Sequence, residues 1–176
     1  MTTVDRHNQR QTRATAWLAL MVVSLAFGGC QSLFRKPEEA VICAVSIHAF
    51  ASEELHRTTL LVRTAEAADG KYITIRATPL LTSHNIMAMQ AMEDPTGRKA
   101  LRAVLDKHGR TCWLQACGEY PGERLAVLVD GIFRFGMNVP TNPPSDGTLY
   151  IVGPWAEAEL KSIAEHSIPN YKLLTN

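Results

Sequence analysis

The sequence has 176 residues, of which 46% are hydrophobic and 20% charged, and its formal net charge is +1. This composition is that of an ordinary globular chain with enough apolar residues for one sizeable core, so it argues against a disordered or collagen-like protein. Lys and Arg are not interleaved with aromatic residues in any stripe, and a nucleic-acid partner is therefore not predicted.

An apolar segment follows a basic N-terminus. Residues 1–13 include three arginines, and residues 14–27 are almost wholly apolar. As a helix the apolar run would be about 21 Å long, which is shorter than the roughly 30 Å hydrocarbon layer of a bilayer. Two glycines then precede Cys30, and small residues before a cleavage site are typical of signal peptides. The pattern predicts a signal peptide over residues 1–29, cleaved between Gly29 and Cys30.

This segment resembles the lipobox of bacterial lipoproteins, although Phe27 stands where that family usually has Leu or a similar aliphatic residue. The resemblance implies that Cys30 carries acyl chains such as palmitate, which would hold the chain firmly on a membrane and facing the periplasm. Gln31 is not the aspartate that retains such lipoproteins in the inner membrane, so the resemblance favours the outer membrane. The alternatives are an uncleaved N-terminal anchor and a buried helix.

Removal of the predicted signal peptide changes the charge and the cysteine count. The remaining body has 15 Lys and Arg against 16 Asp and Glu, and residues 30–40 form a short polar tether with one proline. Besides Cys30 it contains Cys43, Cys112 and Cys117, an odd number. Three alternatives stay open: unpaired apolar cysteines, a disulfide between Cys43 and one of the other two, or a metal site completed by a histidine.

The first half of the body predicts antiparallel sheet. Residues 41–50, 57–64 and 71–78 are rich in β-branched residues and alternate in part, and Asp69 and Gly70 form a turn signal between the last two runs. Next, Thr82 or Ser83 is an N-cap for a short helix within residues 79–86.

The middle of the chain gives divided signals. Residues 86–93 and 99–107 have helix-forming composition. However, residues 94–97 are a tight-turn sequence, and the apolar residues that follow alternate with charged ones as in a hairpin.

The second half alternates helices and strands. A helix with one buried face, ending near Gly118 or Gly122, is predicted after His108 and Gly109. A nearly continuous apolar run over residues 124–131 predicts a central strand with a turn at its end. A proline-rich loop, a strand over residues 148–152 and an amphipathic helix from Pro154 to about Ser167 follow, and residues 169–176 are predicted to be a C-terminal tail.

Residues 79–168 resemble the head subdomain of the first periplasmic region of SecD, the accessory subunit of the bacterial protein translocase. The matching stretches are "PLLTSHNI", "GRKALRAVLDKHGRTCWLQAC", "GERLAVLVDGIF" and "SDGTLYIVGPWAEAELKSIAE". Residues at the corresponding places include Gly122, Leu125, Ala126, Asp130, Gly131, Gly147 and Gly153. Because turns need positive φ, the glycines among them have a structural interpretation.

The resemblance also decides between the divided signals of the middle region. It implies strand over residues 99–106 and a helix that begins after Gly109. The fold class expected for residues 41–168 is a single α+β domain, mostly antiparallel sheet with two or three helices packed on it. The membrane helices that drive SecD are not predicted after residue 29.

Candidate catalytic residues are not grouped in the sequence, and no phosphate loop, HExxH or EF-hand motif occurs. His48 and His56 flank the link between the first two strands, with Glu53 and Glu54 between them, which is either a weak divalent-metal site or a solvated link. We therefore expect no enzyme activity, no cofactor and no established metal site.

The sequence as a whole predicts a lipid-anchored envelope protein that binds a protein or peptide partner through its SecD-head-like domain, at an exposed strand edge. The alternatives are a periplasmic module that binds a small ligand or a metal and, third, a hydrolase or redox enzyme.

Overall fold

The computed structural model describes residues 40–51, 60–94 and 96–176, and the fold is that of residues 41–176. The predicted signal peptide, the cleavage site at Gly29, the lipidation site Cys30 and nearly all of the tether lie outside the described residues. So do Glu53, Glu54 and His56 of the candidate metal site.

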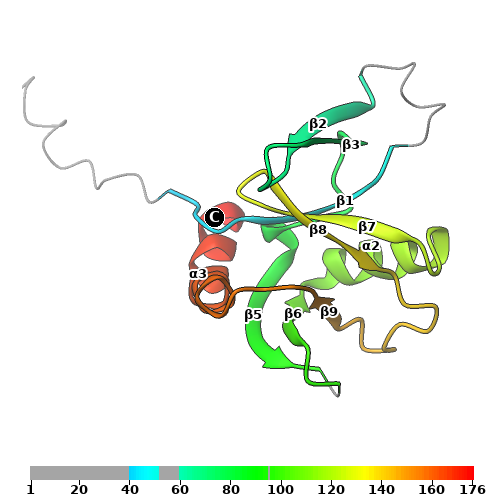
Figure 1. Cartoon of the computed structure of the whole chain (residues 1–176). Helices are drawn as coiled ribbons and strands as arrows, with labels where there is room; N and C mark the ends of the chain where they lie inside the picture. The colour runs from blue at the N-terminus through cyan, green and yellow to red at the C-terminus, as the bar shows by residue number, and fades with distance from the viewer. Residues whose placement is uncertain (1–39, 52–59, 95) are drawn as a thin grey trace, which may run out of the picture. The chain divides into compact units, whose positions relative to one another are not determined.

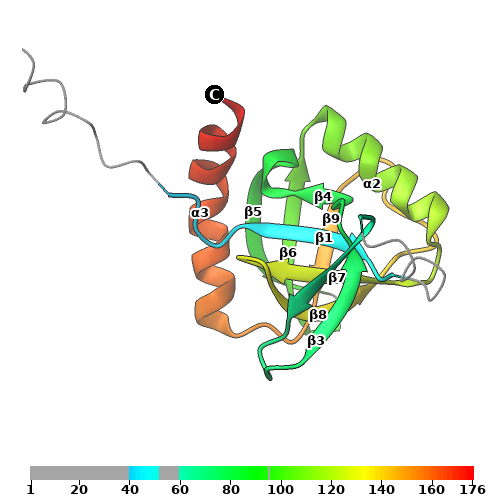
Figure 2. The same cartoon turned by 90° about the horizontal axis from the view of Figure 1, so that it is seen from above.

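The described residues form two larger antiparallel sheets, a separate hairpin and two α-helices (Figures 1 and 2). The four-stranded sheet has the order β4-β1-β7-β8, the three-stranded sheet β5-β6-β9, and the hairpin β2-β3. The predicted α+β class with mostly antiparallel sheet is confirmed. The elements in chain order are β1 (Val45–Ala49), β2 (Val62–Glu66), β3 (Tyr72–Arg76), β4 (Leu81–Thr82), the 3-10 helix η2 (Ser83–Asn85), β5 (Ile86–Glu93), β6 (Lys99–Leu105), α2 (Lys107–Glu119), β7 (Arg124–Val129), β8 (Ile132–Asn138), β9 (Leu149–Val152) and α3 (Glu157–Thr175).

The main core is made by the inward faces of both larger sheets together with α2 and α3. Alternate residues of each strand point inward, as Val45 and Ile47 do on β1, because side chains of a strand alternate between its two faces. Trp113 of α2 and Ile163 of α3 complete this core and are almost fully buried. Each such side chain stabilises the fold by roughly 1.5–3 kcal/mol through its removal from water.

Strand β7 is buried on both faces, which explains its continuous apolar sequence. One face points into the main core, and the β2-β3 hairpin covers the other, where Ala126 and Leu128 pack against Ala65 and Ile75. The predicted central strand is therefore confirmed, with β1 and β8 as its neighbours.

The middle of the chain is strand, as the resemblance implied. β5 and β6 pair in an antiparallel hairpin around the turn that begins at Asp94, so tertiary pairing outweighs helix propensity here. The predicted start of the next helix, after Gly109, was three residues too late. α2 begins at Lys107 because the carboxylate of Asp106 accepts a hydrogen bond from the N–H of Gly109 at 2.6 Å and caps the first turn.

The prediction of a C-terminal tail over residues 169–176 is wrong, because α3 continues to Thr175. An interior proline costs a helix about 3 kcal/mol, and Pro169 stands within α3. Tertiary hydrogen bonds on both sides of it offset this cost. The N–H of Met89 donates to Ser167 Oγ at 2.9 Å, and Asn170 Nδ2 donates to the carbonyl of Ile42 at 2.6 Å.

Two early boundaries also differ from the prediction. β1 begins at Val45 rather than at residue 41, because Cys43 has a positive φ of 55° that interrupts an extended backbone. β2 spans Val62–Glu66, later than the predicted strand over residues 57–64, of which residues 57–59 lie outside the described part.

Candidate functional site

The residues that carry the SecD resemblance occupy structural positions. Gly122, Gly131 and Gly147 have φ values of 75°, 80° and 71° at turns, where a side chain would strain the backbone. Leu125 and Ala126 are fully buried on β7.

Asp130 fixes the start of β1. Its carboxylate accepts hydrogen bonds from the N–H of Cys43 at 3.2 Å and from the N–H of Ala44 at 2.8 Å, and its own N–H donates to the carbonyl of Ala44. The aspartate of the motif therefore has a visible role in holding the first strand on the sheet.

Strands β8 and β9 are the last strands of their sheets. Each has an edge that carries no strand among the described residues, and the edge of β8 makes one isolated bridge there, between Phe133 and Ala67. The N–H of Asp130, at the end of β7, donates to the carbonyl of Ala44 on the side of β1. Backbone N–H and C=O groups alternate between the two sides of a strand, so those of residues 125 and 127 point toward β8. The same alternation along β8 leaves the backbone groups of Gly136 and Asn138 pointing away from β7.

The same alternation applies to the three-stranded sheet. The N–H of Gly153 donates to the carbonyl of Lys99, so by alternation the backbone groups of residues 151 and 149 of β9 point toward β6 and bond to it. The backbone groups of Tyr150 and Val152 therefore point away from β6, to the open edge.

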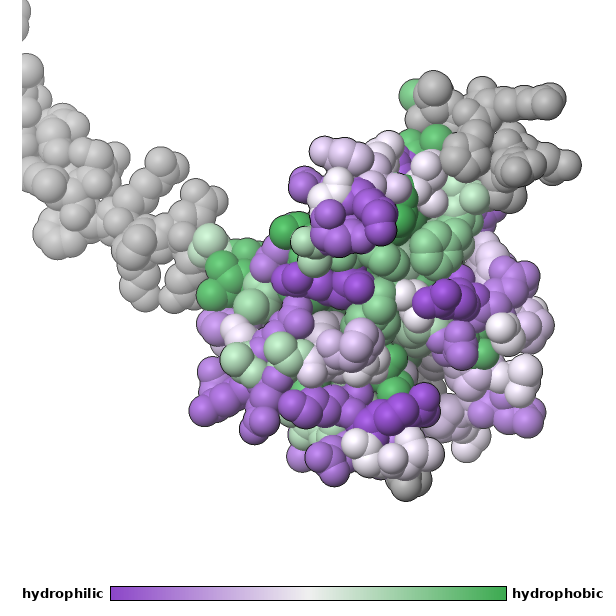
Figure 3. Space-filling model, viewed as in Figure 1, coloured by the Kyte–Doolittle hydropathy of each residue, from purple (hydrophilic) through white to green (hydrophobic). Residues whose placement is uncertain are grey.

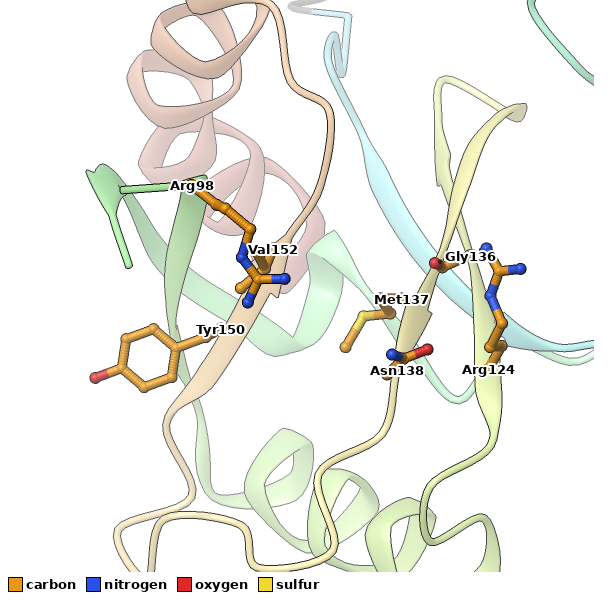
Figure 4. Close-up of a pocket in the computed structure, with 7 residues that line it drawn as sticks. All are labelled: Arg98, Arg124, Gly136, Met137, Asn138, Tyr150 and Val152. Atoms are coloured by element: carbon orange, nitrogen blue, oxygen red, sulfur yellow. Dashed lines mark hydrogen bonds between the residues drawn. The ribbon is translucent and has the colours of Figure 1, made fainter. Parts of the chain in front are cut away.

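These outward-facing residues line one cavity of about 480 Å³, which we call the β8–β9 groove. Its lining residues are Arg98, Arg124, Gly136, Met137, Asn138, Tyr150 and Val152. Figure 4 shows Arg98 and Val152 on the β9 side, facing Met137 and Asn138 on the β8 side, while the ring of Tyr150 points away. The groove thus brings together two strand edges that can accept backbone hydrogen bonds.

A second cavity of about 500 Å³ adjoins the groove and shares Arg98 and Val152 with it. Lys99, Gly153, Pro154 and Trp155 complete its lining. On the face seen in Figure 3, hydrophobic surface is visible near the middle and is framed by hydrophilic side chains.

Aromatic packing connects β8 with the chain that follows β9. The rings of Phe135 and Trp155 pack edge to face with centroids 4.8 Å apart, and Trp155 Nε1 donates to the carbonyl of Ile151 at 3.0 Å. A Cβ atom on Gly153 would lie 2.2 Å from the Phe135 ring, so this close approach requires glycine. Gly153, one of the residues that carry the SecD resemblance, thus lies in the lining of the second cavity.

Arg98 is held at the groove by the β5-β6 turn. Its Nε donates to Asp94 Oδ2 at 2.8 Å, and Asp94 also accepts hydrogen bonds from Thr96 and from the Arg98 backbone. These bonds, that from the Thr96 side chain above all, hold the pKa of Asp94 well below its usual value. The Arg98 side chain is therefore bound to Asp94 where it leaves the turn.

Arg124 reaches the groove across β8. Its Nη2 donates to the outward carbonyl of Gly136 at 3.2 Å, and a Cβ at Gly136 would lie only 2.9 Å from that nitrogen. Among the described residues, Arg124 forms no ion pair with a carboxylate.

His48, the candidate metal ligand, lies buried under the β2-β3 hairpin. Its Nδ1 lies 2.9 Å from the carbonyl of Arg76, and its Nε2 lies 3.0 Å from Arg63 Nη2 and 3.2 Å from Ser46 Oγ. A carbonyl only accepts and a guanidinium only donates, so the imidazole is neutral with its proton on Nδ1. The part of the chain that the structure describes contains no group of three or more metal-ligating side chains.

The three cysteines of the body are free thiols. Cys117 is buried, and burial raises the pKa of its thiol. Cys43 Sγ lies 3.1 Å from Ser162 Oγ, and Cys112 Sγ lies 3.5 Å from His108 Nε2 on the same face of α2. No disulfide pairs Cys43 with Cys112 or Cys117, so that alternative is wrong for this structure.

The groove residues were not among the sites predicted from the sequence. A glycine within a strand, Gly136, is the sequence feature that points to the groove, because it leaves room for the Arg124 side chain. That relation follows only from the pairing of β7 with β8. The helices of the described residues are each too short or too polar to cross a membrane.

No family model and no curated protein matches the sequence. Among solved structures, the chain is similar to one described as "Structure and function of a membrane component SecDF that enhances protein export". The TM-score is 0.52 and the identity 15%, over 73% of this chain and 63% of that one. A second structure, SecDF in a super-membrane-facing form, matches with a TM-score of 0.49 and 15% identity, over 73% of this chain and 18% of that chain.

A third, SecDF of Thermus thermophilus described as translocon-associated, matches with a TM-score of 0.41 and 14% identity, over 94% of this chain and 34% of that chain. The chain therefore spans less than two thirds of the length of each SecDF chain. The first match has the highest TM-score of the three and carries the comparison, which at this identity concerns the fold. The resemblance predicted from the sequence is confirmed: the described residues have a SecDF-like α+β fold.

Proposed function

We propose that this chain is a non-enzymatic, lipid-anchored envelope protein that binds an extended segment of another polypeptide in the β8–β9 groove. The observation that carries the proposal is that two open strand edges, at residues 136 and 138 and at residues 150 and 152, line one cavity. An extended peptide placed there pairs with β8 on one side and with β9 on the other, and main-chain hydrogen bonds supply most of its affinity.

The anchor is supported by the sequence alone. Nine residues separate Cys30 from Ala40, a length that spans at most about 35 Å when fully extended. Lipidation of Cys30 in the outer membrane, facing the periplasm, would keep Ala40, at the start of the folded region, within that distance of the bilayer. The protein of similar fold is described as a membrane component that enhances protein export, which supports an accessory role in the handling of exported polypeptides.

The substitution Val152→Pro tests the groove. It removes the outward N–H of β9, and the inward bonds to β6 stay intact because a proline is tolerated where the N–H of an edge strand faces solvent. Loss of one hydrogen bond of about 0.5–1.5 kcal/mol should weaken peptide binding roughly two- to tenfold. The matched control, Val152→Thr, changes the side chain but keeps the N–H and should bind normally.

Binding is measured on the full chain, purified from membranes in detergent, by the fluorescence anisotropy of labelled peptides of about six residues that alternate Thr and Val. The peptides carry a central Glu, Gln or Lys. Failure of all three to bind, or equal binding by the proline and threonine variants, contradicts the proposal. Intact-mass analysis of the same preparation tests the anchor, since cleavage before Cys30 with added acyl chains is expected.

A further inference from the structure

The β8–β9 groove and the adjoining cavity carry positive charge. Their lining includes Arg98, Lys99 and Arg124, and it includes no aspartate or glutamate within the described part of the chain. The body as a whole is nearly neutral, so this charge is a local feature of the two cavities.

The three cations differ in how far nearby carboxylates neutralise them. Arg98 is bound by Asp94 at 2.8 Å. Lys99 Nζ lies 3.6 Å from Glu157, whose side chain is 90% exposed, so that pair is weak. Arg124 has no such partner among the described residues and donates one observed hydrogen bond, to the carbonyl of Gly136.

The position of Arg124 is built into β8. Glycine at position 136 leaves room for the guanidinium over the strand, since a Cβ there would lie 2.9–3.1 Å from its atoms. The hydrogen bond to the outward carbonyl of Gly136 places the guanidinium at the open edge of β8, beside which a bound segment would lie. A guanidinium has five N–H donors in a planar fork that fits a carboxylate, so most of its donors remain for a ligand.

We propose that the extended segment bound in the β8–β9 groove carries an acidic side chain, Asp or Glu, which pairs with Arg124, while the weakly paired Lys99 adds positive potential. This inference rests on the proposed function and specifies its ligand. A polypeptide fits better than a nucleic acid, because the open edges present backbone N–H and C=O groups that only another peptide backbone satisfies along its length.

The test compares the labelled peptides with central Glu and central Gln, which have nearly the same shape and differ in charge. The wild-type chain should bind the Glu peptide about fivefold more tightly than the Gln peptide, as expected for a partly exposed ion pair, and the Lys peptide most weakly. The preference should shrink as salt is raised, because salt screens exposed charges.

Arg124→Gln should reduce the preference for the Glu peptide to near unity. The control Lys71→Gln removes the same charge at the tip of the β2-β3 hairpin, where Lys71 is 82% exposed and outside both cavities, and should leave the preference unchanged. The salt series on the wild-type chain needs no substitution and therefore tests the ionic origin of the preference even if a variant folds poorly.

Three results would overturn the inference. Equal binding of the Glu and Gln peptides would refute it and leave the proposed function standing, whereas failure of every peptide to bind would refute both. A preference for Glu that persists in Arg124→Gln would show that Arg124 does not recognise the carboxylate of the bound segment.

Discussion

His48 is the buried titratable side chain whose neighbours fix its charge. Burial lowers its pKa, and the positive charge of Arg63 acts in the same direction, while the hydrogen bond to the Arg76 carbonyl opposes them. All three groups lie where the β2-β3 hairpin meets β1. Protonation of the imidazole would turn its acceptor Nε2 into a donor facing a guanidinium.

This environment predicts a loss of stability in mild acid. The folded pKa of His48 lies below the unfolded value of about 6.5, so the unfolded state binds the proton more readily. The contribution of His48 to the free energy of unfolding is fully present above the unfolded pKa. It decreases as the pH falls toward the folded pKa, by at most about 1.4 kcal/mol per pH unit. Urea unfolding between about pH 5 and 8 measures it.

His48→Asn should flatten this pH dependence, because an amide keeps a donor for the Arg76 carbonyl and does not titrate in that range. His84→Asn, at an exposed histidine on η2, is the matched control and should retain the wild-type slope. An unchanged slope in His48→Asn would show that other groups cause the acid sensitivity.

At the scale of elements, the contact between β8 and the end of β9 depends on Gly153 having no side chain. Gly153→Ala should push the Phe135 ring away from Trp155 and destabilise the fold by about 1–3 kcal/mol, the usual cost of overpacking. Gly118 is a useful comparison, since a Cβ there meets nothing within 4 Å and lies in a helix.

Gly118→Ala should therefore stabilise the chain by about 0.5–1 kcal/mol through helix propensity. The free energies of unfolding of both variants are measured by urea titration. Equal effects of the two substitutions would contradict the role assigned to Gly153.

The elements themselves could largely be predicted from the sequence, because their signals are local. The continuous apolar run of β7 and the Asp94 turn each reflect a few neighbouring residues. The extent of α3 could not be predicted, since Pro169 is tolerated only through contacts made by Ser167 and Asn170 to distant segments. The groove is harder still to predict from the sequence, because it depends on the order of strands in two sheets.

At the scale of the molecule, the two larger sheets leave their open edges at the same cavity, and this arrangement makes a specific prediction about peptide binding. In the free chain, residues 137 and 151 point their backbone groups into their own sheets, whereas their neighbours on either side point theirs into the groove. A bound strand would therefore change alternate positions only.

Hydrogen exchange read at single residues, with and without the central-Glu peptide, should show this alternation. The amides of Asn138 and Val152 should gain protection, while those of Met137 and Ile151 are already protected by their own sheets and should change little. With peptide at about a hundred times its Kd, the free energy of unfolding should also rise by about 2.7 kcal/mol. Protection that spread evenly along β8 and β9, or that occurred on α3 instead, would rule out strand addition, because only pairing of backbones distinguishes adjacent residues of one strand by the side to which their N–H groups point.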